Sequence, residues 1–565
     1  MTQDARGCDV LVVEDLRQQR LPARTLVAVL REAGLCARLV HFGADSDPGE
    51  TVALAHSEQP RLIVLSILFA NLVEENLALA TELRAAGVTA HVTMAGPLPT
   101  FAYASLLAAC PEPVEGACPE PVEGACPEPV EGACPEPVEG ACPPLDSVLR
   151  GEAEASIVQL ATGLRDAADW RAVPGLAYRS PALRTNPLPQ PVPDPDALPF
   201  PAWDGGMPTY LGLGFATLEG GRGCYHACTF CLPRAFYSAG PGAPYRLRSI
   251  SDLVEEMNAL YRRGVRLFLF DDEQFLPPGR ARQARVQALG DALERQGLDV
   301  AFTIKCRADD VDEPLFRQLQ AMGLLRVYLG VESGCPASLD LLGKGVTVAR
   351  NAEALALLDA LGVVTDFYSL LFHPWSTLET IRAELEFLEC VLPHVSTAFT
   401  FNEVELYPGT PLFERWQAEK CRPGAAEARA GEAAWRAPYA IADPAAELLR
   451  RLARVVFGAR HAEGGLHDRI VQAWYSVLLL GRFGPERLAA SRARALRAAV
   501  THLNRESLAL WREMLSFAAG GDLYDAGQVN ERAAAWAGRA NALDMMVEEE
   551  LCRRIRSGDF SRSFR

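Results

Sequence analysis

Three cysteines stand close together in the stretch RGCYHACTFC, at residues 222–231. Cys224, Cys228 and Cys231 are separated by three and then two residues. Three thiolates at this spacing can bind three irons of a [4Fe–4S] cluster and leave the fourth iron open to a small ligand. A zinc site with His226 as the fourth ligand and a set of ordinary buried thiols are the alternatives. Structural zinc sites usually combine two separated ligand pairs, and no second pair follows here, so the spacing favours the open iron–sulfur cluster.

The elements around this loop predict a partial barrel. One apolar strand leads into the cysteine loop, and five more follow it, separated by helical segments such as SISDLVEEMNALYRRG at 249–264. Six strand–helix units predict a partial (β/α)6 TIM-type barrel over residues 207–415, with its chemistry at the carboxyl ends of the strands. Polar residues gather at those predicted ends: Asp271, Asp272, Glu273, Lys305, Cys306, Arg307, Glu332, Ser333, His373, Asn402 and Glu403.

Residues 1–170 alternate near-continuous apolar strands with amphipathic helices. This pattern predicts an α/β domain with a parallel sheet covered on both faces, of the flavodoxin-like (Rossmann-like) kind. Such sheets bind ligands at the carboxyl ends of their strands. The relevant loops read EDLRQQR, SILFAN, AGPLPT and RGEAE.

A repeat interrupts this first domain. Residues 109–140 contain four perfect copies of ACPEPVEG, and ACPP follows. Because Pro and Glu at this density cannot bury a core, we predict that residues 109–142 form a disordered surface insertion.

Two further regions complete the organisation of the chain. Residues 171–206 are rich in proline and predict an extended linker. Residues 416–565 are rich in Ala and Arg, with amphipathic helical patterns that predict a helical domain. Its aromatic residues pack in the core or line a cleft: Trp435, Trp474, Tyr475 and Trp511.

Composition limits the classes of partner and compartment. The formal net charge of −17 argues against a broad nucleic-acid-binding face. The longest apolar stretch, residues 62–73, is too short to span a bilayer, and the first residues show no secretory signal. We therefore expect a cytoplasmic protein whose 15 cysteines are reduced thiols or metal ligands.

The cysteine motif resembles that of the radical S-adenosylmethionine (SAM) superfamily. Its form is Cys-x3-Cys-x-aromatic-Cys, with Phe230 before the last cysteine. The stretches DALPFPAWD, FDDEQF, RVYLGVESG, LLGKGVT and YPGTPL resemble the cobalamin-dependent branch of that family. In the first domain, Ser66-Ile67-Leu68, Ala95-Gly96 and the GEAE sequence at 151–154 are similar to corrinoid-binding loops. The histidine loop of such domains is absent, so no histidine from EDLRQQR would ligate cobalt.

The resemblance implies roles for particular residues. Cys224, Cys228 and Cys231 would ligate the cluster, and Asp272 or Glu273 would bind the ammonium group of SAM. The remaining implied contacts to SAM are Phe230 near the adenine, Arg307 on the carboxylate, and Glu332 and Ser333 on the ribose. The implied contacts to cobalamin are Leu16, Arg17, Ser66, Leu68, Gly96, Gly151 and Glu152. Lys344 is expected to close a helix.

The resemblance also implies an activity. It suggests a C-methyltransferase that moves a methyl group from methylcobalamin to a carbon radical made by the 5′-deoxyadenosyl radical. The alternatives are a cobalamin-dependent radical SAM cyclase or rearrangement enzyme, methylation of a nucleophilic carbon without radical cleavage, a tRNA-modifying enzyme, and a non-catalytic corrinoid or redox sensor. The expected partners are a small-molecule or peptide substrate and an external electron donor such as flavodoxin or ferredoxin.

Overall fold

The computed structural model describes most of the chain. The described residues are 7–15, 21–43, 46–108, 144–204, 206–210, 212–399, 401–420, 438–462, 464–484, 486–520 and 525–554, without the side chains of 15, 420, 486–488, 553 and 554. The predicted repeat insertion at 109–142, Trp435 and the predicted cobalamin contacts Leu16 and Arg17 lie outside these residues.

The first sheet has seven strands in the order β2-β1-β3-β4-β5-β6-β7. Strands β1 to β5 are parallel, whereas β6 and β7 add antiparallel pairs at one edge. The strands span Val10–Asp15, Ala37–Phe42, Leu62–Ser66, His91–Ala95, Ser147–Leu149, Leu176–Arg179 and Leu183–Thr185. The last two strands fall inside the predicted linker, so part of that linker extends the first sheet.

Helices cover both faces of this sheet, as its continuous apolar strands predict. Leu11, Val13 and Ile63 pack toward one helical layer, and the alternate residues Val12 and Val64 pack toward the other. The first layer comprises α2 (Pro48–Glu58), α3 (Val73–Ala85) and α4 (Pro97–Leu106). The second layer comprises α1 (Leu21–Glu32) and α5 (Glu154–Arg165).

The second sheet is curled into a partial barrel with the order β15-β14-β13-β12-β9-β8. Its strands from β8 to β15 span Thr209–Tyr210, Leu213–Leu218, Val265–Phe270, Ala301–Arg307, Leu324–Gly330 and Val364–Asp366. All neighbours are parallel except β8 and β9. β16 (Ser369–Phe372) and β17 (Phe401–Glu403) form a separate parallel pair. A single β-bridge between Glu332, just after β14, and Ser369 of β16 connects this pair to the six-stranded sheet. All six predicted strand segments therefore contain strands, and the mixed α/β fold class is confirmed.

Helices of this part follow the strands. They are α7 (Ile250–Arg262), α8 (Ala281–Gln296), α9 (Glu313–Met322), α10 (Pro336–Leu341), α11 (Val348–Ala360) and α12 (Leu378–Val391). Ser249 caps α7, because its side chain accepts a hydrogen bond from the backbone N–H of Asp252 at 3.2 Å. Phe268, Phe302 and Phe316 belong to the apolar core on this helical side of the sheet.

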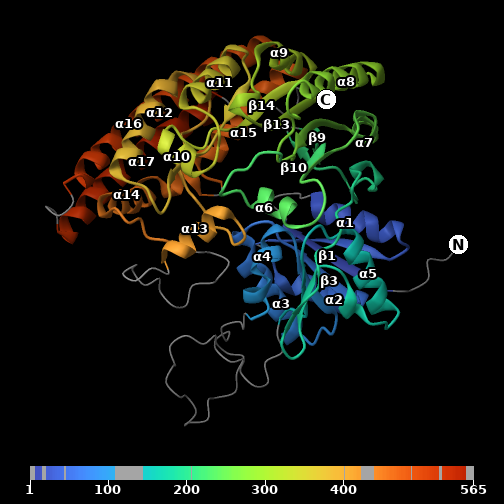
Figure 1. Ribbon diagram of the computed structural model, residues 1–565. Coiled ribbons are helices and arrows are strands. Elements are labelled where there is room, and N and C mark those ends of the chain that lie inside the picture. The colour runs from blue at the N-terminus through green and yellow to red at the C-terminus, as the bar shows by residue number, and fades with distance from the viewer. Residues whose placement is uncertain are drawn as a thin grey trace, which may run out of the picture.

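The cysteine loop lies between the two sheets. It joins β10 (Gly221–Gly223) to α6 (Leu232–Ala239), and β10 pairs with β11 (Tyr245–Leu247) in an antiparallel hairpin. Figure 1 shows β10 and α6 between the first sheet and the half-barrel. This position places the cysteines where both parts of the chain can contribute side chains.

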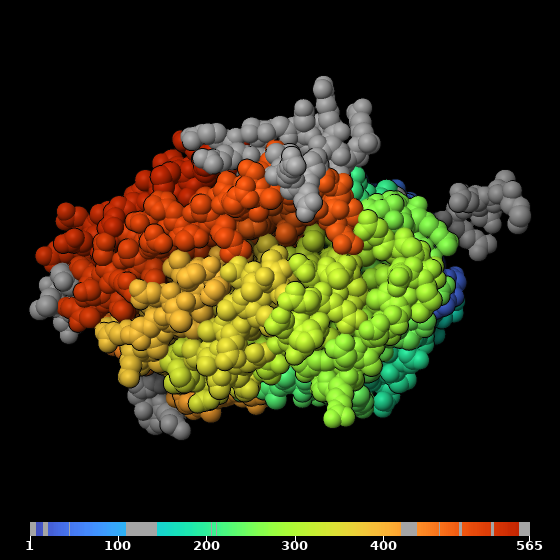
Figure 2. All heavy atoms as spheres, turned by 90° about the horizontal axis from the view of Figure 1, so that it is seen from above, coloured from blue at the N-terminus to red at the C-terminus, as the bar shows by residue number. Residues whose placement is uncertain are grey.

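The C-terminal region is helical, as predicted. It comprises α13 (Pro411–Lys420), α14 (Pro444–His461), α15 (Leu466–Phe483), α16 (Glu486–Ala518) and α17 (Ala526–Arg554). These helices lie along the half-barrel (Figure 2), and α15 packs Leu479 against Leu267 and Ala301 of its strands. Trp474 and Trp511 are buried core residues. Among the described residues, none of the helices is both long enough and apolar enough to span a membrane.

Candidate functional site

The three cysteines occupy a partly buried loop that directs polar hydrogens toward sulfur. Cys224 follows β10, and Cys231 precedes the first residue of α6. The backbone N–H of His226 donates to Cys224 Sγ at 3.4 Å, and Arg307 Nη1 donates to Cys228 Sγ at 3.7 Å. Burial raises the pKa of the Cys224 thiol and that of the Cys231 thiol. Sulfur atoms that accept such hydrogen bonds in a desolvated loop fit the thiolates of an iron–sulfur cluster.

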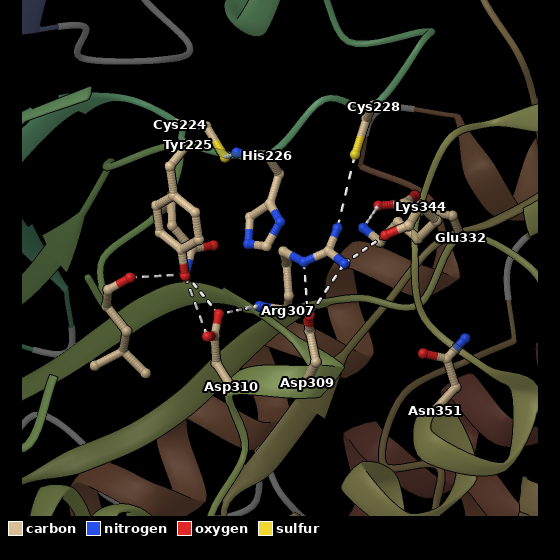
Figure 3. Close-up of polar contacts among 12 residues, drawn as sticks. Cys224, Tyr225, His226, Cys228, Arg307, Asp309, Asp310, Glu332, Lys344 and Asn351 are labelled. Carbon is tan, nitrogen blue, oxygen red and sulfur yellow. Dashed lines mark hydrogen bonds and ion pairs between the residues drawn. The ribbon is translucent and has the colours of Figure 1, made fainter. Parts of the chain in front are cut away.

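Arg307 approaches the loop from the end of β13. Its Nε donates to Asp309 Oδ1 at 2.9 Å, and its Nη2 donates to the backbone carbonyl of Lys344 at 2.5 Å. Figure 3 shows the guanidinium group between Asp309 and Cys228. The predicted contact of Arg307 with the SAM carboxylate stays a prediction, and the structure adds a sulfur contact that the sequence did not indicate.

His226, the fourth ligand of the zinc alternative, lies in the same loop and contacts a neighbouring aromatic ring. The His226 ring packs against Tyr225 with a centroid distance of 4.2 Å, and burial lowers the pKa of His226 to about 4. Within the described ranges, no three His, Cys, Asp or Glu side chains are grouped to hold a single metal ion.

The acidic end of β12 divides between two environments. Asp272 is 1% exposed, and its Oδ2 accepts a hydrogen bond from the backbone N–H of Gly220 at 2.9 Å. Burial raises the pKa of Asp272 to about 7. Asp271 pairs with Lys305 at 2.6 Å, whereas Glu273 lines a cavity beside the cysteine loop. Of the two residues predicted to bind the SAM ammonium group, Glu273 has the more accessible position. Asp272 instead bonds the backbone of Gly220, between β9 and β10.

The end of β14 forms a second charged group. Glu332 adopts a left-handed backbone with φ of 63°, and its Oε1 accepts from Lys344 Nζ at 2.9 Å. The backbone N–H of Lys344 also bonds Leu339 O, so Lys344 closes α10 as predicted and pairs with Glu332 as well.

The Ser333 side chain points to a residue that the sequence analysis missed. Ser333 Oγ donates to Glu384 of α12, and the backbone N–H of Gly334 donates to the same carboxylate at 2.7 Å. The N–H of Cys335 adds a bond at 3.3 Å. Burial raises the pKa of Glu384 to about 7. One feature of the sequence could have indicated Glu384: it is an acidic residue among the apolar residues of the buried face of α12, between Ile381 and Leu388.

Other predicted strand-end residues have structural contacts. His373 Nε2 bonds Ser338 Oγ at 3.1 Å, and Glu403 pairs with Arg450 and Arg454 of α14. Phe230 is half-buried against the apolar group formed by Leu342, Val404, Leu406 and Leu412. Its proximity to an adenine stays a prediction.

A cavity joins the carboxyl edge of the first sheet to the cysteine loop. Its volume is about 890 Å³ with its open mouth included. The five predicted cobalamin contacts within the described residues all line it: Ser66, Leu68, Gly96, Gly151 and Glu152. The half-barrel side of the same cavity includes Glu219, Gly221, Arg222, Gly223, Asp271 and Glu273. The structure thus brings residues of the first sheet and residues of the half-barrel together around one cavity.

Gly96, which lines this cavity, packs its backbone closely against the residue that follows β3. Gly96 has a φ of 129°, and a Cβ atom there would lie 1.9 Å from the carbonyl oxygen of Ile67. Only glycine fits this position, because no other residue can come so close to the neighbouring strand.

Buried ion pairs tie the two sides of the cavity together. Arg222 Nη1 lies 2.9 Å from Glu152 Oε2 and 2.6 Å from Glu154 Oε1, and Arg222 Nε lies 2.9 Å from Glu219 Oε2. Arg246, which is opposite Arg222 in the β10–β11 hairpin, also pairs with Glu152. Arg222, Glu154 and Glu219 were not predicted as site residues, although Arg222 and Glu154 lie within the two motifs that drew attention.

Comparisons with known proteins agree with this geometry. A family model described as the radical SAM superfamily matches residues 218–388. An uncharacterized methyltransferase of Pyrococcus horikoshii is 27% identical over 48% of this chain and 58% of its own length. Hopanoid C-3 methylase of Methylococcus capsulatus is 28% identical over 49% of this chain and 50% of its own length. The chain thus matches little more than half the length of these relatives.

Solved structures resemble nearly the whole chain. The cobalamin-dependent SAM radical enzyme OxsB, solved with aqua-cobalamin and SAM bound, has a TM-score of 0.65 at 17% identity, covering 99% of this chain and 82% of its own. The radical SAM methyltransferase TsrM from Kitasatospora setae, solved with cobalamin and a [4Fe–4S] cluster, has a TM-score of 0.60 at 16% identity, covering 89% of this chain and 100% of its own. Residues 218–388 therefore match the radical SAM superfamily, and the chain shares the fold of these two solved structures.

Proposed function

We propose that this protein is a cobalamin-dependent radical SAM methyltransferase that methylates a carbon atom of a small-molecule or peptide substrate. The observation that carries the proposal is the cavity shared by the first sheet and the cysteine loop. A methyl donor held at the carboxyl edge of the first sheet would lie beside the loop that holds the cluster. The names of the relatives and of TsrM support methyl transfer as the reaction type.

The residues present fit the three groups that this reaction needs. Cys224, Cys228 and Cys231 would hold a [4Fe–4S] cluster with one iron open to the amino and carboxylate groups of SAM. Glu273 would accept hydrogen bonds from the SAM ammonium group, and Glu332 would accept them from its ribose. When bound, the cluster, SAM and methylcobalamin would supply one-electron and methyl-transfer chemistry that amino-acid side chains lack.

The chain itself would bind, orient and exclude water. Ser66 and the backbone at Gly96 and Gly151 line the side of the cavity that would take the corrinoid. Arg222 holds the two sides of the cavity together through its pairs with Glu152 and Glu154. An external one-electron donor such as flavodoxin or ferredoxin would supply the electron.

Anaerobic reconstitution tests the proposal. The full chain is incubated with iron, sulfide and hydroxocobalamin, desalted, and assayed for iron and corrinoid per chain. The test variant combines Cys224→Ala, Cys228→Ala and Cys231→Ala. The matched control is Cys390→Ala, an exposed cysteine of α12 in the same half-barrel.

We expect about four irons per chain, as a [4Fe–4S] cluster requires, and about one corrinoid in the wild type and in Cys390→Ala. The triple variant should lose iron and retain corrinoid. A cluster without corrinoid would contradict the cobalamin-dependent reaction, and bound zinc in place of iron would contradict the whole proposal. With SAM and a reductant, formation of 5′-deoxyadenosine without S-adenosylhomocysteine would favour the cyclisation or rearrangement alternative over methyl transfer.

A further inference from the structure

Arg307 is held in one orientation by contacts on three sides. Asp309 accepts from Nε at 2.9 Å and from Nη2 at 3.2 Å, and the carbonyl of Lys344 accepts from Nη2 at 2.5 Å. The residue is 5% exposed. On the remaining side of the planar guanidinium group, Nη1 faces Cys228, and the distance from Nη1 to Cys228 Sγ is 3.7 Å (Figure 3). Because the fork of an arginine is rigid, fixing two sides of it also fixes the direction of the remaining N–H groups.

The anchors of Arg307 are themselves part of the fold. Asp309 belongs to the short turn that follows β13, so Arg307 and its carboxylate partner come from one continuous segment. Lys344 closes α10 and pairs with Glu332 at the end of β14. The sulfur contact therefore depends on the ends of two neighbouring strands and needs no movement of the cysteine loop.

We propose that Arg307 is a positioning residue that donates a hydrogen bond to the Cys228 sulfur and thereby raises the reduction potential of the cluster. The inference rests on the proposed function, because it requires the cluster held by Cys224, Cys228 and Cys231. Reduction adds one electron from an external donor and takes the cluster from its 2+ to its 1+ state, and no bond forms or breaks. Hydrogen bonds to cluster sulfurs and nearby positive charge stabilise the more negative reduced state.

The test is a redox titration of the reconstituted full chain in the absence of SAM, with dithionite as reductant and the reduced cluster followed by electron paramagnetic resonance. Arg307→Gln removes the charge and the donor fork. Arg307→Lys keeps the charge but cannot hold both anchors and the sulfur contact. The matched control is Arg282→Gln, because Arg282 pairs with Asp310 at 3.0 Å in the turn that Asp309 shares.

We expect the midpoint potential to shift to a more negative value in Arg307→Gln, by less in Arg307→Lys, and least in Arg282→Gln. An unchanged potential in an iron-loaded Arg307→Gln overturns the inference, and so does an equal shift in Arg282→Gln. If Arg307→Gln takes up no iron, an unchanged potential in Arg307→Lys overturns it instead.

Measuring SAM binding separates this role from the one predicted from the sequence. A weaker affinity for SAM with an unchanged potential would assign Arg307 to the SAM carboxylate and overturn the inference. Absence of a cluster in the wild type would instead refute the proposed function, so the two failures are distinguishable.

Discussion

Arg222 offers the sharpest test of how the two halves of the cavity are joined. In Arg222→Met, Glu152, Glu154 and Glu219 lose their shared counter-ion, and Arg246 still pairs with Glu152. The side chains of Arg222, Glu152 and Glu154 are 6%, 9% and 10% exposed. At this burial the cost of removing one partner is that of leaving charges desolvated and unpaired, about 3–5 kcal/mol.

The magnitude follows from comparison with an exposed pair. Arg317 and Glu313 lie 2.6 Å apart, but their side chains are 64% and 57% exposed. Water screens such a pair, so Arg317→Met should cost about 0–1 kcal/mol. Arg222→Met should therefore lower the free energy of unfolding by several times more than Arg317→Met.

Two measurements check this prediction. Urea denaturation gives the free energy of unfolding, and amide hydrogen exchange reports local opening. In Arg222→Met we expect faster exchange at Gly151–Glu154 and at β10, because the ion pairs that connect these segments are gone. A loss no larger than that of Arg317→Met, with unchanged exchange at both segments, would refute the argument that these buried pairs hold the two sides together.

Three further changes test single features of the fold. Glu384→Gln should lower the free energy of unfolding by about 1–3 kcal/mol in urea denaturation, because the amide group cannot accept all the bonds from Gly334, Cys335 and Ser333; an unchanged value would show that these contacts contribute nothing. Burial lowers the pKa of His91 from 6.5 to about 4, so the unfolded chain binds the extra proton. The resulting stability is present above pH 6.5 and is lost as the pH falls toward 4, by about 3 kcal/mol; His91→Asn should remove this part of the slope, and an identical slope would contradict it. Gly96→Ala should weaken hydroxocobalamin binding, measured by equilibrium dialysis, because its Cβ would overlap the Ile67 carbonyl; wild-type affinity would contradict this.

The sequence alone determined the type of each part and the chemistry of the cysteine loop. Apolar periodicity is a local property, so the parallel sheet, the half-barrel strands and the C-terminal helices could all be predicted from it. The spacing of Cys224, Cys228 and Cys231 is also local, and it was sufficient to favour an open cluster over zinc. The loops that contain Ser66, Gly96 and Glu152 were identified from their position, because the carboxyl ends of parallel strands meet at one edge. The residues themselves were chosen from their resemblance to corrinoid-binding loops.

Only the tertiary structure decided which polar residues meet. Asp272 and Glu273 are adjacent in the sequence, yet one supports Gly220 and the other lines the cavity. Both lie in the loop beyond Phe270, where β12 ends, so the alternation of a strand does not set their directions. Arg222 and Glu152 are 70 residues apart, and Ser333 and Glu384 are 51 apart. Such pairs depend on how helices and sheets pack, and charge or periodicity along the chain carries no information about that packing. Which polar residues at the strand ends line a ligand site, and which make buried contacts within the fold, is therefore decided only when the chain folds.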